Sequence, residues 1–485
     1  NKIKDSQRCT VIIGNPPYAG VSVNRSPASQ RLVDRYRYVA GKRLEEVKLW
    51  LQNDYIKFIS LVHNSIELSG TGVLGFITDN SYLDGPTFRG VRHGLAETFG
   101  AIDVLDLRGS TKRRDRTTDG AADENVFDIM QGVSIILCVS HPIYNEKKVQ
   151  YTSLSGTRSE KYNCLLRREV NYERTPWSAP FYLFVKSDHS LQEEYNVGIR
   201  ITDAFIVKGN GFMTGRDSFA VGFTESEVRT RISEFFDLEI PDDDIRKRYG
   251  ISDYRAFKIG DVRRKQKFDP HRIVKASYRP FDHRWTYFQR PIIQEWQSGV
   301  HNHIFNRDNL ALCVGRAGNV VGGTWDICFC TKMVTDLNQF YRGGNVSLPI
   351  YRYATADDLF SERSSNISTK MITAIKKALG LSHKDDTQSP YLMPEIVLQY
   401  AYGVFFSPSY RNRYSEFLKY DFPRLPLPGS LPLYEQLSSF GGRLLKLHLL
   451  EDGHDSNQRI KFNGTNRIIT KAGWTEEGGG TIWLD

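Results

Sequence analysis

The tetrapeptide Asn15-Pro16-Pro17-Tyr18 holds the residue types that could most directly do chemistry in this chain. It follows an apolar run at residues 11–13 and Gly14, a pattern that predicts a buried strand ending at a turn. The two prolines fix the backbone and remove two N–H donors, which leaves an amide oxygen and bare carbonyls as rigid acceptors. Such acceptors can hold both N–H bonds of an exocyclic amino group while the tyrosine ring stacks on a flat base. A nitrogen held in this way keeps a free lone pair and can attack a methyl donor.

A plain turn is the alternative explanation of this tetrapeptide, because Asn-Pro often starts turns and Pro-Pro is common in linkers. The position after a predicted strand favours chemistry, since open α/β sheets bind their ligands at the carboxyl ends of strands. We therefore treat Asn15, Pro16, Pro17 and Tyr18 as candidate catalytic residues.

Strand-like and helix-like stretches alternate over the first part of the chain, whereas short strand signals and many turns follow. Strands separated by helices predict a mostly parallel α/β sheet. The loop before the fourth strand lacks a helical period, so the third and fourth strands should be antiparallel. We expect two domains. The first is the α/β domain at residues 1–148, and the second is an α+β region at 149–485 with one or two subdomains. The expected strands are 11–13, 73–77, 101–107 and 133–139, and the expected helices are 44–68, 87–99, 224–258, 371–379, 391–402 and 434–450.

The composition is that of a globular protein, with 485 residues, 40% hydrophobic and 25% charged. No apolar run approaches the ~20 residues of a membrane span and no signal peptide is evident, so a membrane partner is not expected. Six scattered cysteines suit a reducing cytoplasm better than a disulfide framework. A net charge of +9 and an aromatic content of 12% are compatible with a nucleic-acid partner.

Basic residues gather in two stretches, the loop 108–131 and the cluster 263–267. A solvated surface or contacts to phosphate groups would explain either stretch. Arg216 and Arg279 could read bases, although structural salt bridges would explain them equally well. The candidate DNA-binding residues are Lys112, Arg113, Arg114, Arg216, Arg263, Arg264, Lys265 and Arg279.

Phe127, in the loop 108–131, lies where an aromatic ring could face Tyr18 across a pocket.

Two metal-like patterns do not predict a metal site. Cys328-Phe329-Cys330 has no second cysteine pair at ligand spacing, and alternation within a strand explains it better. His301-Asn302-His303 lacks the strand and helix context of a nuclease motif.

Taken together, the motifs resemble a known family. Residues 13–18 look like the catalytic motif of amino-group DNA methyltransferases, particularly the adenine-N6 γ class. Four later stretches, at 72–90, 123–129, 278–282 and 407–411, look like type I single-polypeptide (type ISP) restriction–modification enzymes. The similarity runs over nearly the whole chain.

This resemblance implies a fold and an activity. The fold would be the carboxyl-terminal half of a Rossmann-like methyltransferase sheet followed by an α+β target recognition domain. The activity would be site-specific DNA adenine-N6 methylation with S-adenosylmethionine. By residue, Asn15 and the Pro16 carbonyl would hold the adenine amino group, Tyr18 would stack on the flipped base, and Phe127 would stack on its other face. Flipping costs a few kcal/mol, which a stacking clamp could offset.

The resemblance also implies partners. They are double-stranded DNA, an upstream methyltransferase half, and helicase and nuclease modules of the same polypeptide, in a bacterial or archaeal cytoplasm. The Gly-rich cofactor loop normally precedes the tetrapeptide, so only Asn15 should touch the cofactor, at its edge. We therefore expect this chain alone to bind S-adenosylmethionine poorly.

Two other functions stay open. The chain could be a DNA-binding specificity module whose tetrapeptide pocket is catalytically inactive. It could also methylate another amino group, such as cytosine N4 or a protein glutamine. Ser or Asp often replaces Asn in cytosine-N4 enzymes, so Asn15 favours adenine.

Overall fold

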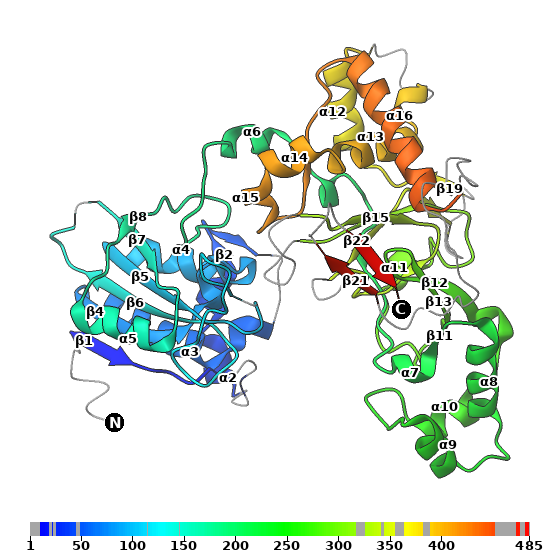
Figure 1. Ribbon diagram of the computed structural model, residues 1–485, viewed down its shortest axis with the longest axis horizontal. Helices are drawn as coiled ribbons and strands as arrows, with labels where there is room; N and C mark the ends of the chain where they lie inside the picture. Colours follow the sequence, from blue (N-terminus) through cyan, green and yellow to red (C-terminus); the bar gives the residue numbers. More distant parts are fainter. Residues whose placement is uncertain are drawn as a thin grey trace.

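Two lobes make up the protein (Figure 1). The first lobe extends from the first strand to Val185 and the second contains the green to orange elements of Figure 1. No helix of the described part is long and apolar enough to cross a membrane. The computed structural model describes residues 10–18, 22, 26–44, 49–113, 115–144, 146–316, 325–340, 344–354, 363–381, 389–451, 472–475 and 481–484.

The first lobe is built on a mixed sheet of six strands within the described residues. The first two strands in the sheet order are parallel, as are β5 and β7, whereas β6 is antiparallel to both of its neighbours. The four expected strands and the antiparallel pair are therefore confirmed. The expectation of a mostly parallel sheet is wrong, because β6 returns without a helical crossover and inserts between β4 and β5. The sheet order is β1 (Val11–Gly14), β4 (Gly72–Asp79), β6 (Val133–Ser140), β5 (Ala101–Arg108), β7 (Lys148–Ser153) and β8 (Glu173–Arg174).

The boundary expected after residue 148 needs correction. Residue 148 begins strand β7, which pairs with β5 along its whole length. Helix α5 (Arg158–Arg167) follows, and the first-lobe core also includes Phe184. The boundary was expected because the alternating strand and helix patterns give way to short strand signals and turns after residue 141. The chain nevertheless stays in the first lobe through two more strands.

Helices α3 (Asp54–Ser69) and α4 (Arg89–Thr98) cover the sheet and share one hydrophobic core with it. Helix α3 ends at Gly70, whose φ of +77° is a left-handed conformation that glycine adopts without strain. This helix begins ten residues later than expected, because Lys42–Arg43 forms a short strand and Leu49–Gln52 a 3-10 turn. Apolar spacing alone does not separate such short elements from the helix that follows them.

The second lobe contains two four-stranded sheets within the described residues. Its Cys328–Thr331 strand carries the two cysteines of the discounted zinc pattern, so the expectation of a strand there is confirmed. The first sheet has the order β10 (Gly209–Asn210), β17 (Val346–Pro349), β14 (Ala311–Val314) and β15 (Cys328–Thr331), and the second has β11 (Val221–Gly222), β13 (Asp282–Tyr287), β12 (Ile273–Arg279) and β16 (Val334–Thr335).

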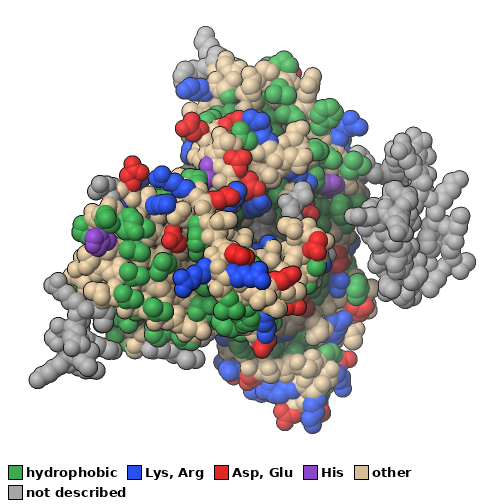
Figure 2. Space-filling model, turned by 60° about the vertical axis from the view of Figure 1, so that its left-hand side comes forward, with side chains coloured by type: hydrophobic (Ala, Val, Ile, Leu, Met, Phe, Trp, Pro, Cys, Tyr) green, Lys and Arg blue, Asp and Glu red, His purple; other side chains and the backbone are tan. Residues whose placement is uncertain are grey.

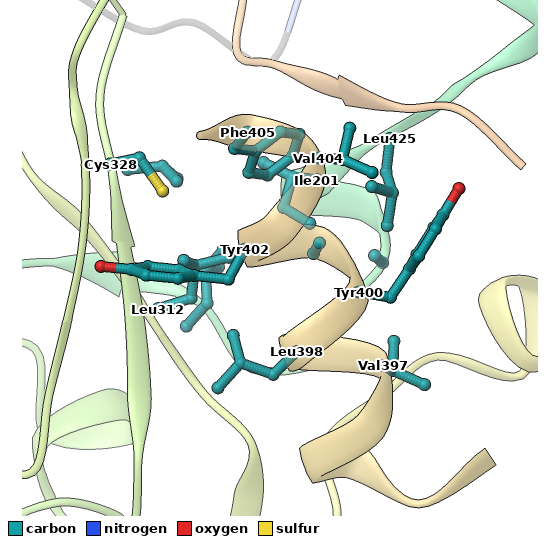
Figure 3. Close-up of a cluster of buried hydrophobic side chains, with 14 of the residues drawn as sticks. Ile201, Leu312, Cys328, Val397, Leu398, Tyr400, Tyr402, Val404, Phe405 and Leu425 are labelled. Carbon is teal, nitrogen blue, oxygen red and sulfur yellow. The ribbon is translucent and has the colours of Figure 1, made fainter. Parts of the chain in front are cut away.

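Helices α13 (Pro394–Phe405) and α16 (Leu431–His448) pack closely in the second lobe. A Cβ atom at Gly441 would lie 1.8 Å from the carbonyl oxygen of Gln399, so only glycine permits this approach. Figure 3 shows Tyr402 pointing toward the strands that carry Leu312 and Cys328, while Tyr400 points to the opposite side of α13. The other helices there are α6 (Gln192–Val197), α7 (Asp217–Ala220), α8 (Glu225–Phe236), α9 (Asp242–Tyr249), α10 (Ile259–Lys265), α11 (Ser298–His301), α12 (Thr369–Leu379), α14 (Pro408–Arg413) and α15 (Ser415–Leu418).

Candidate active site

The tetrapeptide lies at the carboxyl end of strand β1, as its sequence position predicts. Because Gly14 pairs with Phe76 in a parallel register, the tetrapeptide reaches the carboxyl end of β4. The Tyr18 hydroxyl donates a hydrogen bond to the Ile77 carbonyl at 3.3 Å, which ties the two strand ends together. Asn15 is exposed, Pro16 is buried and Tyr18 is half-buried. The site therefore offers an exposed amide beside an anchored aromatic ring.

Tyr18 and Asn15 are also joined directly. The single proton of the Tyr18 hydroxyl is shared between the Ile77 carbonyl and Asn15 Oδ1, which is the nearer acceptor at 2.5 Å. Burial, followed by the nearby Asp79 carboxylate, raises the pKa of Tyr18 to about 12, so the hydroxyl keeps its proton at neutral pH. The acceptor that the sequence assigns to a ligand amino group is thus occupied by a side chain of the same loop. A ligand donor would share Oδ1 with the Tyr18 hydroxyl or replace it.

Buried polar residues at the ends of β4 and β5 are hydrogen-bonded to neighbouring groups. Asp79 accepts a hydrogen bond from the backbone N–H of Ser81 at 2.7 Å. Asn80 donates to Asp106 Oδ1 at 2.9 Å, and Tyr151 donates to the other carboxylate oxygen at 3.2 Å. Burial raises the pKa of Asp106. Sequence reasoning missed Asn80 and Asp106, although both lie at the ends of expected strands, where polar residues would have been a signal.

Phe127 lies in the loop that leads from β5 to β6. Its ring is half-buried and packs against a small hydrophobic cluster that includes Leu107 and Val133. Tyr18 packs against the main core of the lobe. Ile77 links the two sides, because its carbonyl accepts from Tyr18 and its side chain belongs to the Phe127 cluster.

Three of the candidate DNA-binding arginines are bound by partners within the structure. Arg113 pairs with Asp84 at 3.1 Å, and Arg279 pairs with Asp336 at 3.0 Å. Arg216 donates to three backbone carbonyls, and its guanidinium lies 3.8 Å from the centre of the Phe257 ring. Their partners occupy much of each guanidinium. This agrees with the structural explanation that the sequence left open for Arg216 and Arg279, whereas Arg113 was expected either to be solvated or to contact phosphate.

Arg263 requires a correction. Its side chain is 2% exposed, it donates to the carbonyls of Phe235, Asp237 and Ile240, and it pairs with Asp242. A guanidinium with these partners does not reach a phosphate group, so the cluster 263–267 divides into one buried arginine and exposed basic residues, two of which are candidates. The exposed candidates are Arg264, 61% exposed, and Lys265, 75% exposed.

Three of the candidate DNA-binding residues are exposed, and a fourth lies outside the residues that the structure describes. Lys112 is exposed in the same loop as Phe127. Arg264 and Lys265 lie in helix α10, 3.6 Å and 3.7 Å from Asp242 and Asp261. Exposed pairs of this kind exchange readily with other partners, including phosphate. Arg114 lies outside the described residues. Figure 2 shows acidic and basic side chains interspersed over the visible face rather than gathered in one basic patch.

The second lobe matches the family model described as the Type ISP C-terminal specificity domain, over residues 203–485. The chain belongs to this family. The first lobe precedes the Type ISP specificity domain and carries the tetrapeptide. A curated relative, the type II methyltransferase M.BanIII of Aneurinibacillus aneurinilyticus, is 32% identical over 102 residues, which are 21% of this chain and 15% of that protein.

Solved structures share the fold of this Type ISP chain. A DrdV–DNA complex matches with a TM-score of 0.68 and 22% identity, covering 92% of this chain and 45% of that one. The ATP-dependent Type ISP restriction–modification enzyme LlaBIII bound to DNA matches with 0.67 and 24%, covering 92% and 30%. A nuclease-deletion mutant of the Type ISP enzyme LlaGI with a DNA substrate mimic matches with 0.66 and 21%, covering 92% and 42%. This chain therefore spans less than half the length of these structures.

Proposed function

We propose that this chain is the base-binding and DNA-recognising part of an adenine-N6 DNA methyltransferase in a restriction–modification enzyme. The observation that carries the proposal is the placement of Asn15-Pro16-Pro17-Tyr18 at the carboxyl end of β1, with an exposed amide beside an anchored ring. Membership of the Type ISP specificity family supports a role in DNA recognition, and the similarity to a type II methyltransferase supports methyl transfer.

The first-lobe sheet fits the carboxyl-terminal half of a Rossmann-like methyltransferase sheet. Strand β1 lies at the edge of the described sheet. Val11 is 57% exposed and Ile13 is 79% exposed on the face of this edge strand. A bare edge with an apolar face is a template for further strands and packing. We propose that a cofactor-binding half of the enzyme covers this edge and completes the site.

The residues of this chain would bind and orient the base. Asn15 Oδ1 and the Pro16 carbonyl would accept the two N–H bonds of the adenine amino group. The Tyr18 ring would stack on one face of the flipped base and Phe127 on the other. When adenine binds, its amino group would replace the Tyr18 hydroxyl at Asn15 Oδ1. S-adenosylmethionine, when bound, supplies an electrophilic methyl group. The exposed amide of Asn15 suits a position at the edge of that cofactor. The enzyme's main task is positioning, because the methyl donor carries its own good leaving group.

The second lobe would read double-stranded DNA. The exposed cations that we assign to phosphate contacts are Arg264 and Lys265 of the second lobe, together with Lys112 of the first lobe. The solved structures with this fold are described as DNA complexes, which supports the assignment. Helicase and nuclease modules of the same polypeptide, in a bacterial or archaeal cytoplasm, complete the proposal.

The Asn15→Ala variant of the complete enzyme tests this function. Loss of a hydrogen-bond acceptor for the reacting group should lower the methylation rate by about 100-fold or more, by analogy with oxyanion-hole deletions. DNA binding in a mobility-shift assay should stay within about twofold, because the phosphate contacts lie elsewhere. Asn196→Ala, at an exposed position of α6, is the matched control and should change neither quantity.

Two results would favour other functions. Full methylation by Asn15→Ala would show that the tetrapeptide is not catalytic, which leaves a DNA-binding specificity module. Nucleoside analysis of the methylated DNA tests whether the site methylates a different amino group. N4-methylcytosine in place of N6-methyladenine would assign the site to cytosine.

A further inference from the structure

We infer that helix α5 (Arg158–Arg167) positions Phe127 for the base-stacking clamp, an inference that rests on the proposed function. The helix lies outside the region that the sequence assigns to catalysis. It contacts the segment 123–128, which contains Phe127, through a buried ion pair and several hydrogen bonds from three of its side chains.

The buried ion pair is the first contact. Lys161 Nζ lies 2.9 Å from Asp123 Oδ1, and both side chains are 0% exposed. The same ammonium group donates to the carbonyls of Leu107 at 2.8 Å and Glu124 at 2.6 Å. Asp123 also accepts the backbone N–H groups of Gly109 and Gly156. One lysine therefore joins α5, the end of strand β5 and the beginning of the Phe127 segment.

Two further side chains of α5 hold the backbone on both sides of Phe127. The Tyr162 hydroxyl donates to the Val126 carbonyl at 2.8 Å, which is the carbonyl of the peptide bond that precedes Phe127. Arg158 donates to the Asn125 carbonyl at 2.8 Å and to the Asp128 carboxylate at 2.7 Å. The contacts thus include the residue immediately before Phe127 and the residue immediately after it.

Asn125 completes the frame from within the loop. Its Nδ2 group donates to the carbonyls of Gly109, Ile129 and Gln131, and its Oδ1 accepts the backbone N–H of Phe127 at 2.9 Å. A Cβ atom at Gly109, where φ is +77°, would lie 2.5 Å from Asn125 Cα. This side chain closes the loop and fixes the peptide that carries the ring.

The ring itself has weaker support than its backbone. Phe127 is only half-buried and packs at the margin of a small cluster. Its position is therefore set mainly by the backbone, which α5 and Asn125 hold. A ring fixed before the base arrives loses less conformational entropy when it stacks. Tyr162, Arg158, Lys161 and Asn125 are thus positioning residues that act through Phe127.

Tyr162→Phe in the complete enzyme tests the inference. The change removes one hydroxyl from a side chain that is partly exposed, so the fold should tolerate it. Loss of one such hydrogen bond should lower kcat by about fivefold, with KM for DNA unchanged. The fluorescence of 2-aminopurine at the target position, which reports the flipped base, should change in parallel. Tyr36→Phe is the matched control, because it removes a buried hydroxyl contact to His63 in the same lobe, away from the loop.

A double-variant cycle separates positioning from general structural support. In a Phe127→Ala background, Tyr162→Phe should have no further effect on kcat, because the ring through which it acts is gone. A fivefold loss that persists in that background would overturn the inference, and so would wild-type kcat and fluorescence in the single variant. The proposed function is judged separately, because it stands or falls with methylation by Asn15→Ala.

Discussion

Replacement of Lys161 by methionine should be unusually costly for the first lobe. The ammonium group is fully buried, lies 2.9 Å from an equally buried carboxylate, and donates to two backbone carbonyls. Methionine fills a similar volume but supplies no charge and no donor. The variant leaves Asp123 as a buried charge without its counter-ion and leaves two carbonyls without this donor.

The magnitude follows from what is left behind rather than from what the pair contributes. Breaking a buried ion pair by removing one partner costs about 3–5 kcal/mol, mostly for the uncompensated charge. The N–H groups of Gly109 and Gly156 still stabilise the Asp123 carboxylate, which should keep the loss within that range. Lys147→Met provides the contrast, since Lys147 and Glu97 form an exposed pair at 3.0 Å whose loss should cost about 1 kcal/mol or less.

Native-state hydrogen exchange, read in peptides from β5 and β6, measures this loss for the first lobe alone. Lys161→Met should lower the protection of these strands by about 3–5 kcal/mol, and Lys147→Met should barely change it. Adding Asp123→Leu to Lys161→Met should recover part of the loss, because it removes the buried charge. Equal losses in Lys161→Met and Lys147→Met would refute the reasoning.

Two further outcomes follow from groups in the same lobe. Tyr18→Phe removes the hydroxyl that occupies Asn15 Oδ1 but keeps the ring, so single-turnover methylation should stay within about threefold, while Tyr18→Leu should lose about 5- to 100-fold. Equal damage by both would contradict stacking as the role of Tyr18. Burial, and then Arg35, lowers the pKa of His63 to about 3, so below its unfolded pKa of about 6.5 the unfolded chain takes up a proton that the folded lobe does not. Stability should therefore fall between pH 7 and pH 4.5 by about 2.5 kcal/mol more in the wild type than in His63→Gln, as measured by hydrogen exchange. Parallel pH profiles would contradict the buried neutral histidine.

Local pattern was enough to locate most elements of the first lobe. Apolar runs bounded by Gly or polar residues identified the strands at 11–14, 72–79, 101–108 and 133–140, and Gly70 marked the end of α3. Local pattern did not predict the domain boundary, nor that the sheet is mixed rather than mostly parallel. Both depend on how strands β6 and β7 pair with strands distant in the chain, which no local period reports.

The candidate site divides in the same way. The placement of Asn15 and Tyr18 at a strand end followed from neighbouring residues, because prolines and glycine restrict the backbone locally. The occupied acceptor of Asn15 and the packing of Phe127 required the folded chain. Arg263 shows the limit most clearly, since its partners lie 21 to 28 residues away and its charge reads in the sequence like that of its exposed neighbours.

The sequence by itself determined the rigid strand-to-loop turn, its amide and aromatic chemistry, and the family to which the motifs point. These properties depend on covalent restriction of the backbone and on residues next to each other. Only the tertiary structure decided which arginines are buried, that Tyr18 holds Asn15, and that helix α5 supports the Phe127 segment. The reason is that these contacts depend on the positions that side chains take in the folded chain, and it is burial that determines which charged groups remain available to a ligand.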